Sequence, residues 1–411
     1  MEKIIKPEVL SPAGNLKTLK TAIDFGADAV YFAGREFGMR AAANNFTIDE
    51  IAQGVAYAHA RGKKAYLTLN TLPRNNEIDR LPEFIEAVAQ TGIDAFIVTD
   101  IGVISICKKH APNVSLHISV QTGIVNYMSA RTYHDMGADR IVVARELSID
   151  EIAEIRAKTP KSLEIEAFAH GAVCMAVSGR CLLSNYMTNR DSNRGECAQP
   201  CRWNYQLVEE KRPGEYMRVI EDDDGSYILN ARDMCMIEHI PELYNAGVCC
   251  LKLEGRAKTE YYVAAVTNAY ARATSEFAQI GNDYKPSCEL LEEVMKISHR
   301  AYSTGFYFGR PEDGQVYGSG GYIRDYELVG VVEDHTDGLT TIAQRNKFYP
   351  GTLDVLDPVF GQFEIESGEL FDKDMNSLEC ARYAAQPVKF YSRPLTPGAF
   401  LRIKKEQRTI V

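Results

Sequence analysis

One pattern recurs along the chain and limits what it can fold into. A glycine ends an amphipathic stretch, one or two small or polar residues follow, and a short apolar run comes next, as in FGADAVYF and MGADRIVV. Glycine in this place is typical of the helix-to-strand junction of a parallel α/β fold, because it readily adopts the left-handed conformation that ends a helix. The pattern occurs at residues 25–32, 91–98, 136–143 and 246–253, with a looser copy at 61–69.

Eight apolar segments alternate with amphipathic stretches, and they predict a (β/α)8 barrel of the TIM type. Helices are expected at 47–60, 80–91 and 148–158. Thr47 and Ser148 are suitable N-caps for two of them, because Glu50 and Glu151 follow three residues later and complete capping boxes. Further helices at 260–279 and 289–300 should close the barrel. The predicted strands are residues 7–12, 28–33, 64–70, 95–100, 115–121, 140–146, 163–169 and 249–255.

The apolar period changes to two from residue 326 onward. Short alternating runs separated by turn residues, such as YELVGVVED and VFGQFEIE, indicate a small antiparallel β-barrel. We therefore expect a barrel domain at 1–300 that carries an insertion at about 168–237 after the seventh strand. A linker rich in Gly and Tyr at 301–325 and a second domain at 326–411 complete the prediction.

Composition places the chain among ordinary globular proteins, with 45% hydrophobic and 25% charged residues in 411. No apolar run approaches the roughly 20 residues of a membrane span, and the first residues lack a signal-peptide core. A cytoplasmic location is expected. The net charge of −10 counts mildly against nucleic-acid binding by the whole surface, although a local basic groove needs only a few Arg and Lys.

The insertion opens with a cysteine-rich segment that has no hydrophobic periodicity. Cys174, Cys181, Cys197 and Cys201 are separated by six, fifteen and three residues, with glycines nearby. In a reducing compartment such cysteines indicate metal or redox chemistry rather than disulfides. A buried 4Fe-4S iron–sulfur cluster is the central hypothesis. Zinc is the competitor, although only the last pair has zinc-knuckle spacing. Cys235 is an alternative fourth ligand in place of Cys197 or Cys201.

Polar and charged residues follow the apolar runs where the predicted strands end. In this fold those positions point into the active site. Arg145 and Arg256 matter most, because two guanidinium groups could clamp a small dicarboxylate; a buried ion pair with Glu146 or Glu254 is the alternative. Asn70 and Gln121 could bind substrate carbonyls, and His170 could serve as a proton donor. The set is Ser11, Asn70, Gln121, Arg145, Glu146, His170, Glu254 and Arg256.

The cysteine segment resembles the signature of the U32 peptidase family. Glu166, Phe168, Gly171, Cys174, Gly179, Cys181 and Ser184 fit its fixed positions. LSPAGN at 10–15, ILNARDMC at 228–235, KLEGR at 252–256 and YSTGFYFG at 302–309 are also similar to that family, so the resemblance covers nearly the whole chain.

The resemblance implies chemistry that the residues alone do not. Better-understood branches of this family are oxygen-independent hydroxylases that carry a 4Fe-4S cluster on cysteines of this segment. The CAQPCRWNY and LNARDMC stretches look most like the branch that makes 5-hydroxyuridine at the tRNA wobble position, with prephenate as a co-substrate. The implied partners are the tRNA anticodon loop, a small dicarboxylate and a paralogous subunit.

Two other functions stay open at this stage. The first is a collagenase-like U32 peptidase, but the sequence has no H-E-x-x-H or G-x-S-x-G motif, and only His170 with Cys174 could form a nucleophile–base pair. The second is a scaffold or partner subunit of another hydroxylase, of the ubiquinone or ribosomal RNA type. The residues assigned to chemistry are His170, Arg145, Arg256 and Glu254, with Asn70 and Gln121 for substrate and Cys174, Cys181, Cys197 and Cys201 for metal.

Overall fold

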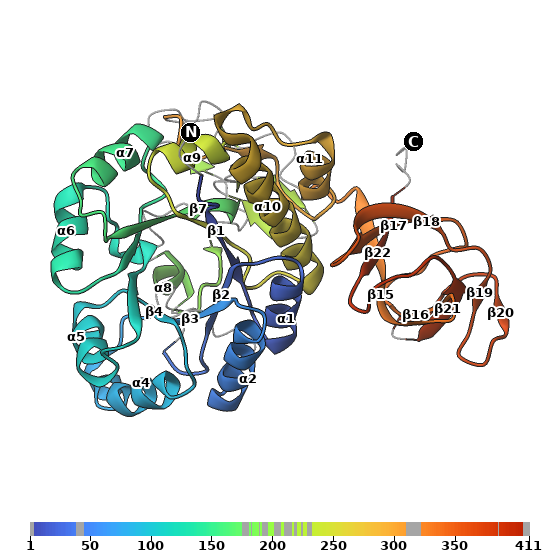
Figure 1. The fold of residues 1–411 in the computed structure, drawn as a ribbon, viewed down its shortest axis with the longest axis horizontal. Helices are drawn as coiled ribbons and strands as arrows, with labels where there is room; N and C mark the ends of the chain where they lie inside the picture. Colours follow the sequence, from blue (N-terminus) through green and yellow to red (C-terminus); the bar gives the residue numbers. More distant parts are fainter. Residues whose placement is uncertain are drawn as a thin grey trace.

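A computed structural model of the chain describes most of the two predicted domains (Figure 1). No helix among the described residues is long and apolar enough to cross a membrane. The described residues are 4–37, 45–174, 181, 183–188, 190, 196–200, 207–208, 216–217, 220–222, 225–227, 232–309, 322–384 and 386–405.

Eight parallel strands form a closed barrel, as the repeat predicted. Each strand pairs with the next one along the chain, and β13 pairs with both β7 and β1, which closes the cylinder. The strands are β1 (Glu8–Pro12), β2 (Ala29–Ala33), β3 (Lys64–Leu69), β4 (Ala95–Val98), β5 (Ser115–Ile118), β6 (Arg140–Val142), β7 (Glu164–Ala172) and β13 (Cys250–Leu253).

Helices outside the insertion surround the barrel, and most of them bury an apolar face against it (Figure 1). Both predicted capping boxes are present: Thr47 begins α2 with Glu50, and Ser148 begins α7 with Glu151. The helices are α1 (Leu16–Asp24), α2 (Ile48–His59), α3 (Asn75–Ile78), α4 (Leu81–Ala89), α5 (Ile101–His110), α6 (Tyr127–Asp135), α7 (Ile149–Ala157), α8 (Leu183–Thr188), α9 (Ile240–Asn245), α10 (Glu260–Ile280) and α11 (Cys288–Met295).

Two short strands extend the sheet beside β7 and were absent from the sequence prediction. β12 (Asp233–Cys235) runs antiparallel to the end of β7, and β14 (Tyr302–Ser303) runs parallel to β12. Tyr307, inside the predicted linker, is buried and donates a hydrogen bond of 2.6 Å to the carbonyl of Phe168. The first part of the predicted linker therefore packs with the barrel. The helix expected at 289–300 ends at Met295.

The insertion after β7 contributes two small antiparallel pairs in its described parts. β8 (Leu207–Val208) pairs with β9 (Tyr216–Met217), and β10 (Ile220–Asp222) pairs with β11 (Gly225–Tyr227).

The C-terminal domain is an antiparallel sheet of eight strands that curves around its own apolar core (Figure 1). Five of its strands match predicted segments, while β19, β20 and β22 were not expected. The strands are β15 (Tyr326–Thr336), β16 (Leu339–Gln344), β17 (Thr352–Asp357), β18 (Gly361–Glu366), β19 (Leu370–Phe371), β20 (Ser377–Leu378), β21 (Pro387–Tyr391) and β22 (Phe400–Lys404).

A buried ion-pair network joins this sheet to the barrel. Arg402 of β22 is fully buried and donates to both carboxylate oxygens of Glu293 in α11, each at 2.6 Å. It also donates to Asp354 of β17, which pairs with Lys296 at the end of α11. Phe400 packs against Phe25 of the barrel layer at 5.7 Å between ring centroids. The two domains therefore share a buried, directional contact rather than a flexible tether.

Candidate functional site at the carboxyl end of the barrel

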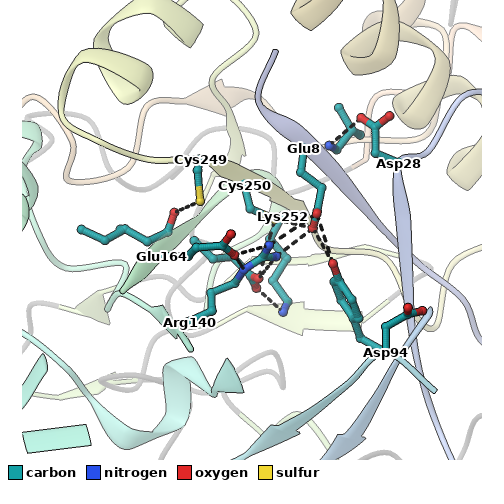
Figure 2. Close-up of polar contacts among 12 residues, drawn as sticks. Glu8, Asp28, Asp94, Arg140, Glu164, Cys249, Cys250 and Lys252 are labelled. Carbon is teal, nitrogen blue, oxygen red and sulfur yellow. Dashed lines mark hydrogen bonds and ion pairs between the residues drawn. The ribbon is translucent and has the colours of Figure 1, made fainter. Parts of the chain in front are cut away.

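The interior of the barrel carries charged side chains where branched apolar residues are usual. Arg140 of β6 contacts Glu8 of β1 at 2.7 Å and Glu164 of β7 at 2.6 Å, and it also faces Glu166 at 3.3 Å (Figure 2). Lys252 of β13 lies 2.6 Å from the other oxygen of Glu166. Ion pairs thus join the four strands β1, β6, β7 and β13. The only sequence signal was charge at alternating positions of β7 and β13.

Two opposing effects, burial and the nearby Arg140, set the pKa of Glu8 in this network. Burial by itself would raise it, but the Arg140 guanidinium holds the pKa of Glu8 below its ordinary value of 4.5. The ammonium group of Lys252 also lies 4.5 Å from the ring centroid of Tyr31 on β2. Lys252 is therefore oriented by a carboxylate on one side and an aromatic face on another.

Arg256 reaches across the carboxyl end of the barrel, as its position after β13 suggested. Its Nη1 donates to Thr68 Oγ1 of β3 at 2.9 Å, and the side chain is only 6% exposed. On the neighbouring strands Thr99 donates to Gln121 Oε1 at 3.2 Å. Asn70 Oδ1 is buried and has no hydrogen-bond partner among the described residues. Three of the predicted residues thus line the same end of the barrel.

Arg145 lies at this end too, but it also holds the backbone that leads to the first cysteine. Its guanidinium is 4.0 Å from the ring centroid of Phe168, and Nη1 donates to the carbonyl of Ala172 at 2.9 Å. Ala172 is two residues before Cys174. An arginine has five N–H donors, so this anchor leaves capacity for a substrate carboxylate.

Glu254 sits close to the end of β7. Tyr31 donates to Glu254 Oε2 at 3.3 Å, which places that carboxylate beside the inward-facing ring. Gly171 has φ +109°, and a Cβ there would lie 2.5 Å from the Glu254 carbonyl oxygen. Only glycine allows this approach, which explains the glycine at that position of the strand.

His170 does not point into the barrel, in contrast to the expectation. The β7–β13 register shifts by one residue after Lys252, so His170 pairs with Leu253 and takes the outer face of the sheet. Its ring packs against Tyr262 and Tyr270 of α10, and Nε2 is 3.4 Å from the Tyr302 hydroxyl. Burial, with His299 and Lys258 nearby, lowers the pKa of His170 to about 3. This neutral, enclosed imidazole is placed to support β7 rather than to donate a proton at the mouth.

Ser11 also faces outward. Its Oγ lies 2.7 Å from Thr267 Oγ1 of α10, and its side chain is fully buried. The hydroxyl joins β1 to the helix layer, so it does not reach the mouth of the barrel.

The described cysteines of the segment have features that suit metal ligands. Cys174 and Cys197 are exposed, and Cys181 is half-buried. The backbone N–H of Leu183 donates to Cys181 Sγ, and that of Gln199 donates to Cys197 Sγ, each at 3.4 Å. Such N–H···S hydrogen bonds stabilise thiolates and tune iron–sulfur clusters.

Ser184 connects the two cysteine turns. It is buried at the start of α8, and its Oγ accepts the N–H of Ala198 at 2.9 Å. The turn that carries Cys181 is therefore bound directly to the turn that carries Cys197. Cys201 lies outside the described residues, and among those described no three His, Cys, Asp or Glu side chains are gathered as a metal site. The four-cysteine ligand set stays a prediction.

Cys235, the alternative fourth ligand, contacts the helix layer. It lies on β12, paired with His170, and its Sγ is 3.8 Å from the Tyr270 hydroxyl of α10. Burial raises the pKa of this thiol to about 11. This contact describes the packing of Cys235 and leaves the choice between Cys201 and Cys235 as the fourth ligand a prediction.

Comparison with known proteins gives matches over both domains. Residues 14–316 match the family model of Peptidase family U32, and residues 324–402 match the model of the Peptidase family U32 C-terminal domain. The chain is 38% identical to tRNA hydroxylation protein P1 of Bacillus subtilis, over 97% of this chain and 94% of that protein. It is 36% identical to tRNA hydroxylation protein P of Escherichia coli, over 86% and 87%. A protein named collagenase from Porphyromonas gingivalis is 33% identical over 88% and 84%.

Proposed function

The chain belongs to peptidase family U32, and from this premise we propose that it hydroxylates tRNA. The proposed reaction converts the wobble uridine to 5-hydroxyuridine without dioxygen, depends on a 4Fe-4S cluster, and uses a prephenate-like dicarboxylate as co-substrate. The observation that carries the proposal is the similarity, along both domains, to relatives named tRNA hydroxylation proteins. The polar mouth of the barrel supports it.

The residues proposed to hold the cluster are Cys174, Cys181, Cys197 and Cys201. The N–H donors on two of these sulfurs and the Ser184 bridge between their turns fit thiolate ligands. When bound, a cluster of this kind supplies electron transfer or Lewis acidity. The Arg145 guanidinium and the backbone N–H of Glu254 hold the end of β7, from which the first ligand follows.

The mouth of the barrel is proposed to bind the small acid. Arg256 and Arg145 supply guanidinium groups from β13 and β6, and carboxylates are the anions that such planar donors pair with. Gln121 and the buried Asn70 amide could contact the carbonyl or hydroxyl groups of the acid. The wobble base must be splayed out of the anticodon loop to reach this pocket, because its C5 atom is otherwise enclosed by stacking.

Nucleoside mass spectrometry of tRNA tests the function directly. A deletion strain should lack 5-hydroxyuridine and its derivatives at the wobble position, and a plasmid copy of the gene should restore them. Unchanged 5-hydroxyuridine in the deletion strain, in the absence of a second copy of the gene, would refute the proposal.

A peptidase is the second candidate, favoured by the relative named collagenase. Cysteine proteases need a histidine beside the nucleophilic thiol. His170, the candidate base, is enclosed by tyrosines of α10 and β14, which argues against this pairing. Cleavage of collagen-derived peptides by protein free of metal, abolished by Cys174→Ala, would establish the peptidase instead.

The Arg256→Lys substitution should separate acid binding from RNA binding. Lysine keeps the charge but loses the planar pair of donors, so affinity for prephenate should fall by about tenfold to a hundredfold, as for loss of a charged hydrogen bond. Affinity for tRNA should change by less than about twofold. Isothermal titration with each ligand measures both, and the exposed Arg80→Lys serves as the control. Equal losses for prephenate and tRNA would contradict the clamp.

The Ser184→Ala substitution should reduce cluster occupancy. Loss of the Ser184–Ala198 hydrogen bond removes the direct link between the two cysteine turns, and it should lower the free energy of unfolding by about 1 kcal/mol. Iron and sulfide per chain after anaerobic reconstitution should therefore fall, while tRNA binding is kept. Ser148→Ala removes the N-cap hydroxyl of α7, which also accepts a backbone N–H, and it should leave the iron content per chain unchanged. Equal iron loss in both variants would mean general destabilisation.

A further inference from the structure

We infer that a basic, aromatic patch of the C-terminal domain binds the phosphodiester backbone of tRNA. The patch consists of Lys347, Tyr349, Arg382 and Tyr383, on the loop between β16 and β17 and the segment before β21. This inference rests on the proposed function, and it assigns part of the RNA-binding surface to residues far from the barrel mouth in sequence.

A backbone bridge brings the two loops together. Phe348 N donates to the Ala381 carbonyl at 3.2 Å, and Ala381 N donates to the Phe348 carbonyl at 2.9 Å. Both side chains are 1% exposed, whereas Lys347, Tyr349 and Arg382 beside them are exposed. In an antiparallel bridge of this kind Lys347 lies directly opposite Arg382.

Lys347 and Arg382 carry like charges in opposed positions, which is unfavourable in a sheet. Both side chains are exposed, so they do not contribute to the apolar core. Like charges in directly opposed positions destabilise a strand pair. Glu379 offsets part of the repulsion, since its Oε2 lies 2.9 Å from Arg382 Nη2, but it is a single carboxylate on an exposed pair. This local surplus of positive charge stands on a chain whose net charge is −10. A bound polyanion would remove the repulsion.

Two tyrosines complete the surface. Tyr349 is 56% exposed and Tyr383 is 64% exposed, although large aromatic side chains usually bury most of their area. Lys347 Nζ lies 4.8 Å from the ring centroid of Tyr349. Exposed rings interleaved with Lys and Arg are the combination that RNA-binding surfaces use, with the rings for stacking and the cations for phosphates. This pairing favours RNA over an acidic peptide, which offers charge without bases to stack.

The docking of the domain makes such a distant contact useful. Arg402 and Glu293 join the sheet to α11 through two buried hydrogen bonds, so the patch keeps a fixed position relative to the barrel. A rigid tRNA can then be held by the patch while its anticodon loop is presented to the mouth. A flexible tether would give no such alignment.

Salt-dependent binding of an unmodified tRNA transcript to the full-length protein tests the patch. Each of Lys347→Ala and Arg382→Ala should weaken binding by about threefold to tenfold at low salt. Each should also lower the slope of log affinity against log salt by about 0.7–0.9, the effect of losing one phosphate contact. Tyr349→Leu and Tyr383→Leu should weaken binding without changing the slope. Lys373→Ala, an exposed lysine of the same domain 3.9 Å from Asp374, is the control and should behave as wild type.

The outcomes distinguish the patch from the proposed function. Wild-type slopes in Lys347→Ala and Arg382→Ala, or an equal change in Lys373→Ala, would overturn the patch, and the function would stand if wild type restores 5-hydroxyuridine in the deletion strain. Binding of polyglutamate that is lost in these two variants while tRNA binding is kept would reassign the patch to an acidic peptide. Wild-type protein that neither binds tRNA nor restores the modification would overturn both. Circular dichroism checks that each variant is folded.

Discussion

Replacing Arg140 with Met is expected to lower the free energy of unfolding of the barrel by about 3–5 kcal/mol. Arg140 is 2% exposed and is the cation shared by Glu8, Glu164 and Glu166. Removing Arg140 takes the cation away from the mostly buried Glu8, and breaking a buried ion pair in this way is strongly destabilising, although Glu166 keeps Lys252. Urea unfolding followed by circular dichroism measures the loss.

An exposed arginine provides the matched control. Arg61 lies 3.4 Å from Asp24 and over the Tyr57 ring, but at the surface, so Arg61→Met should lower stability by less than about 1 kcal/mol. The double variant Arg140→Met/Glu8→Gln should recover part of the loss, because one uncompensated charge is removed. If Arg140→Met is no more destabilising than Arg61→Met, the interior network does not stabilise the barrel.

The same network predicts an acid-sensitive barrel. The folded-state pKa of Glu8 lies below 4.5, so its contribution to stability is present above about pH 4.5 and is lost as the pH falls through the folded pKa. In Arg140→Met the pKa of Glu8 should rise, because burial then acts without the guanidinium. Stability measured between pH 3 and 6 should accordingly begin to fall at a higher pH in the variant than in wild type.

Changing Cys181 to Ala is expected to prevent binding of the proposed cluster and, with it, tRNA hydroxylation. Ligand loss removes binding energy that is coupled to folding of the cysteine segment. Anaerobically purified protein should then be colourless, with iron and sulfide near background, and the variant gene should fail to restore 5-hydroxyuridine in the deletion strain. The Cys181 sulfur accepts a backbone N–H, and the turn that carries it is bound to the turn of Cys197, so its loss should affect both turns.

Cys288→Ala is the control for this experiment, since Cys288 is an exposed cysteine at the start of α11 outside the segment. It should keep the iron content and colour of wild type. Full iron and sulfide in Cys181→Ala would show that the ligand set is wrong, and zinc in stoichiometric amount in wild type would replace the cluster by a structural zinc site.

Local sequence patterns predicted much of the architecture because the interactions behind them are short-range. The eight apolar segments, five of them marked by the glycine-to-strand repeat, located all eight barrel strands, and the capping boxes at Thr47 and Ser148 formed as expected. Period-two alternation located five of the C-terminal strands. The short strands β19 and β20 escaped because two residues are too few to show a period.

The candidate site was predicted in part. Positions after strands brought Arg145, Arg256, Gln121 and Asn70 to one end of the barrel, because parallel strands place their carboxyl ends together. The same rule misplaced Ser11 and His170, whose side chains face α10. Alternation assigns a side to each residue only while the register is continuous, and the shift between β7 and β13 reverses it at His170.

By itself, the sequence determined the order of the eight barrel strands, the caps at Thr47 and Ser148, the change to an antiparallel domain and the position of the cysteine segment, because each depends on neighbours within a few residues. Only the tertiary structure decided which charges meet. Arg140 pairs with Glu8, which is 132 positions away in the chain, and Arg402 pairs with Glu293, which is 109 positions away. Such partners become adjacent only when the barrel closes and the second domain docks, since electrostatic pairing depends on distance in space and leaves no periodic trace in the sequence.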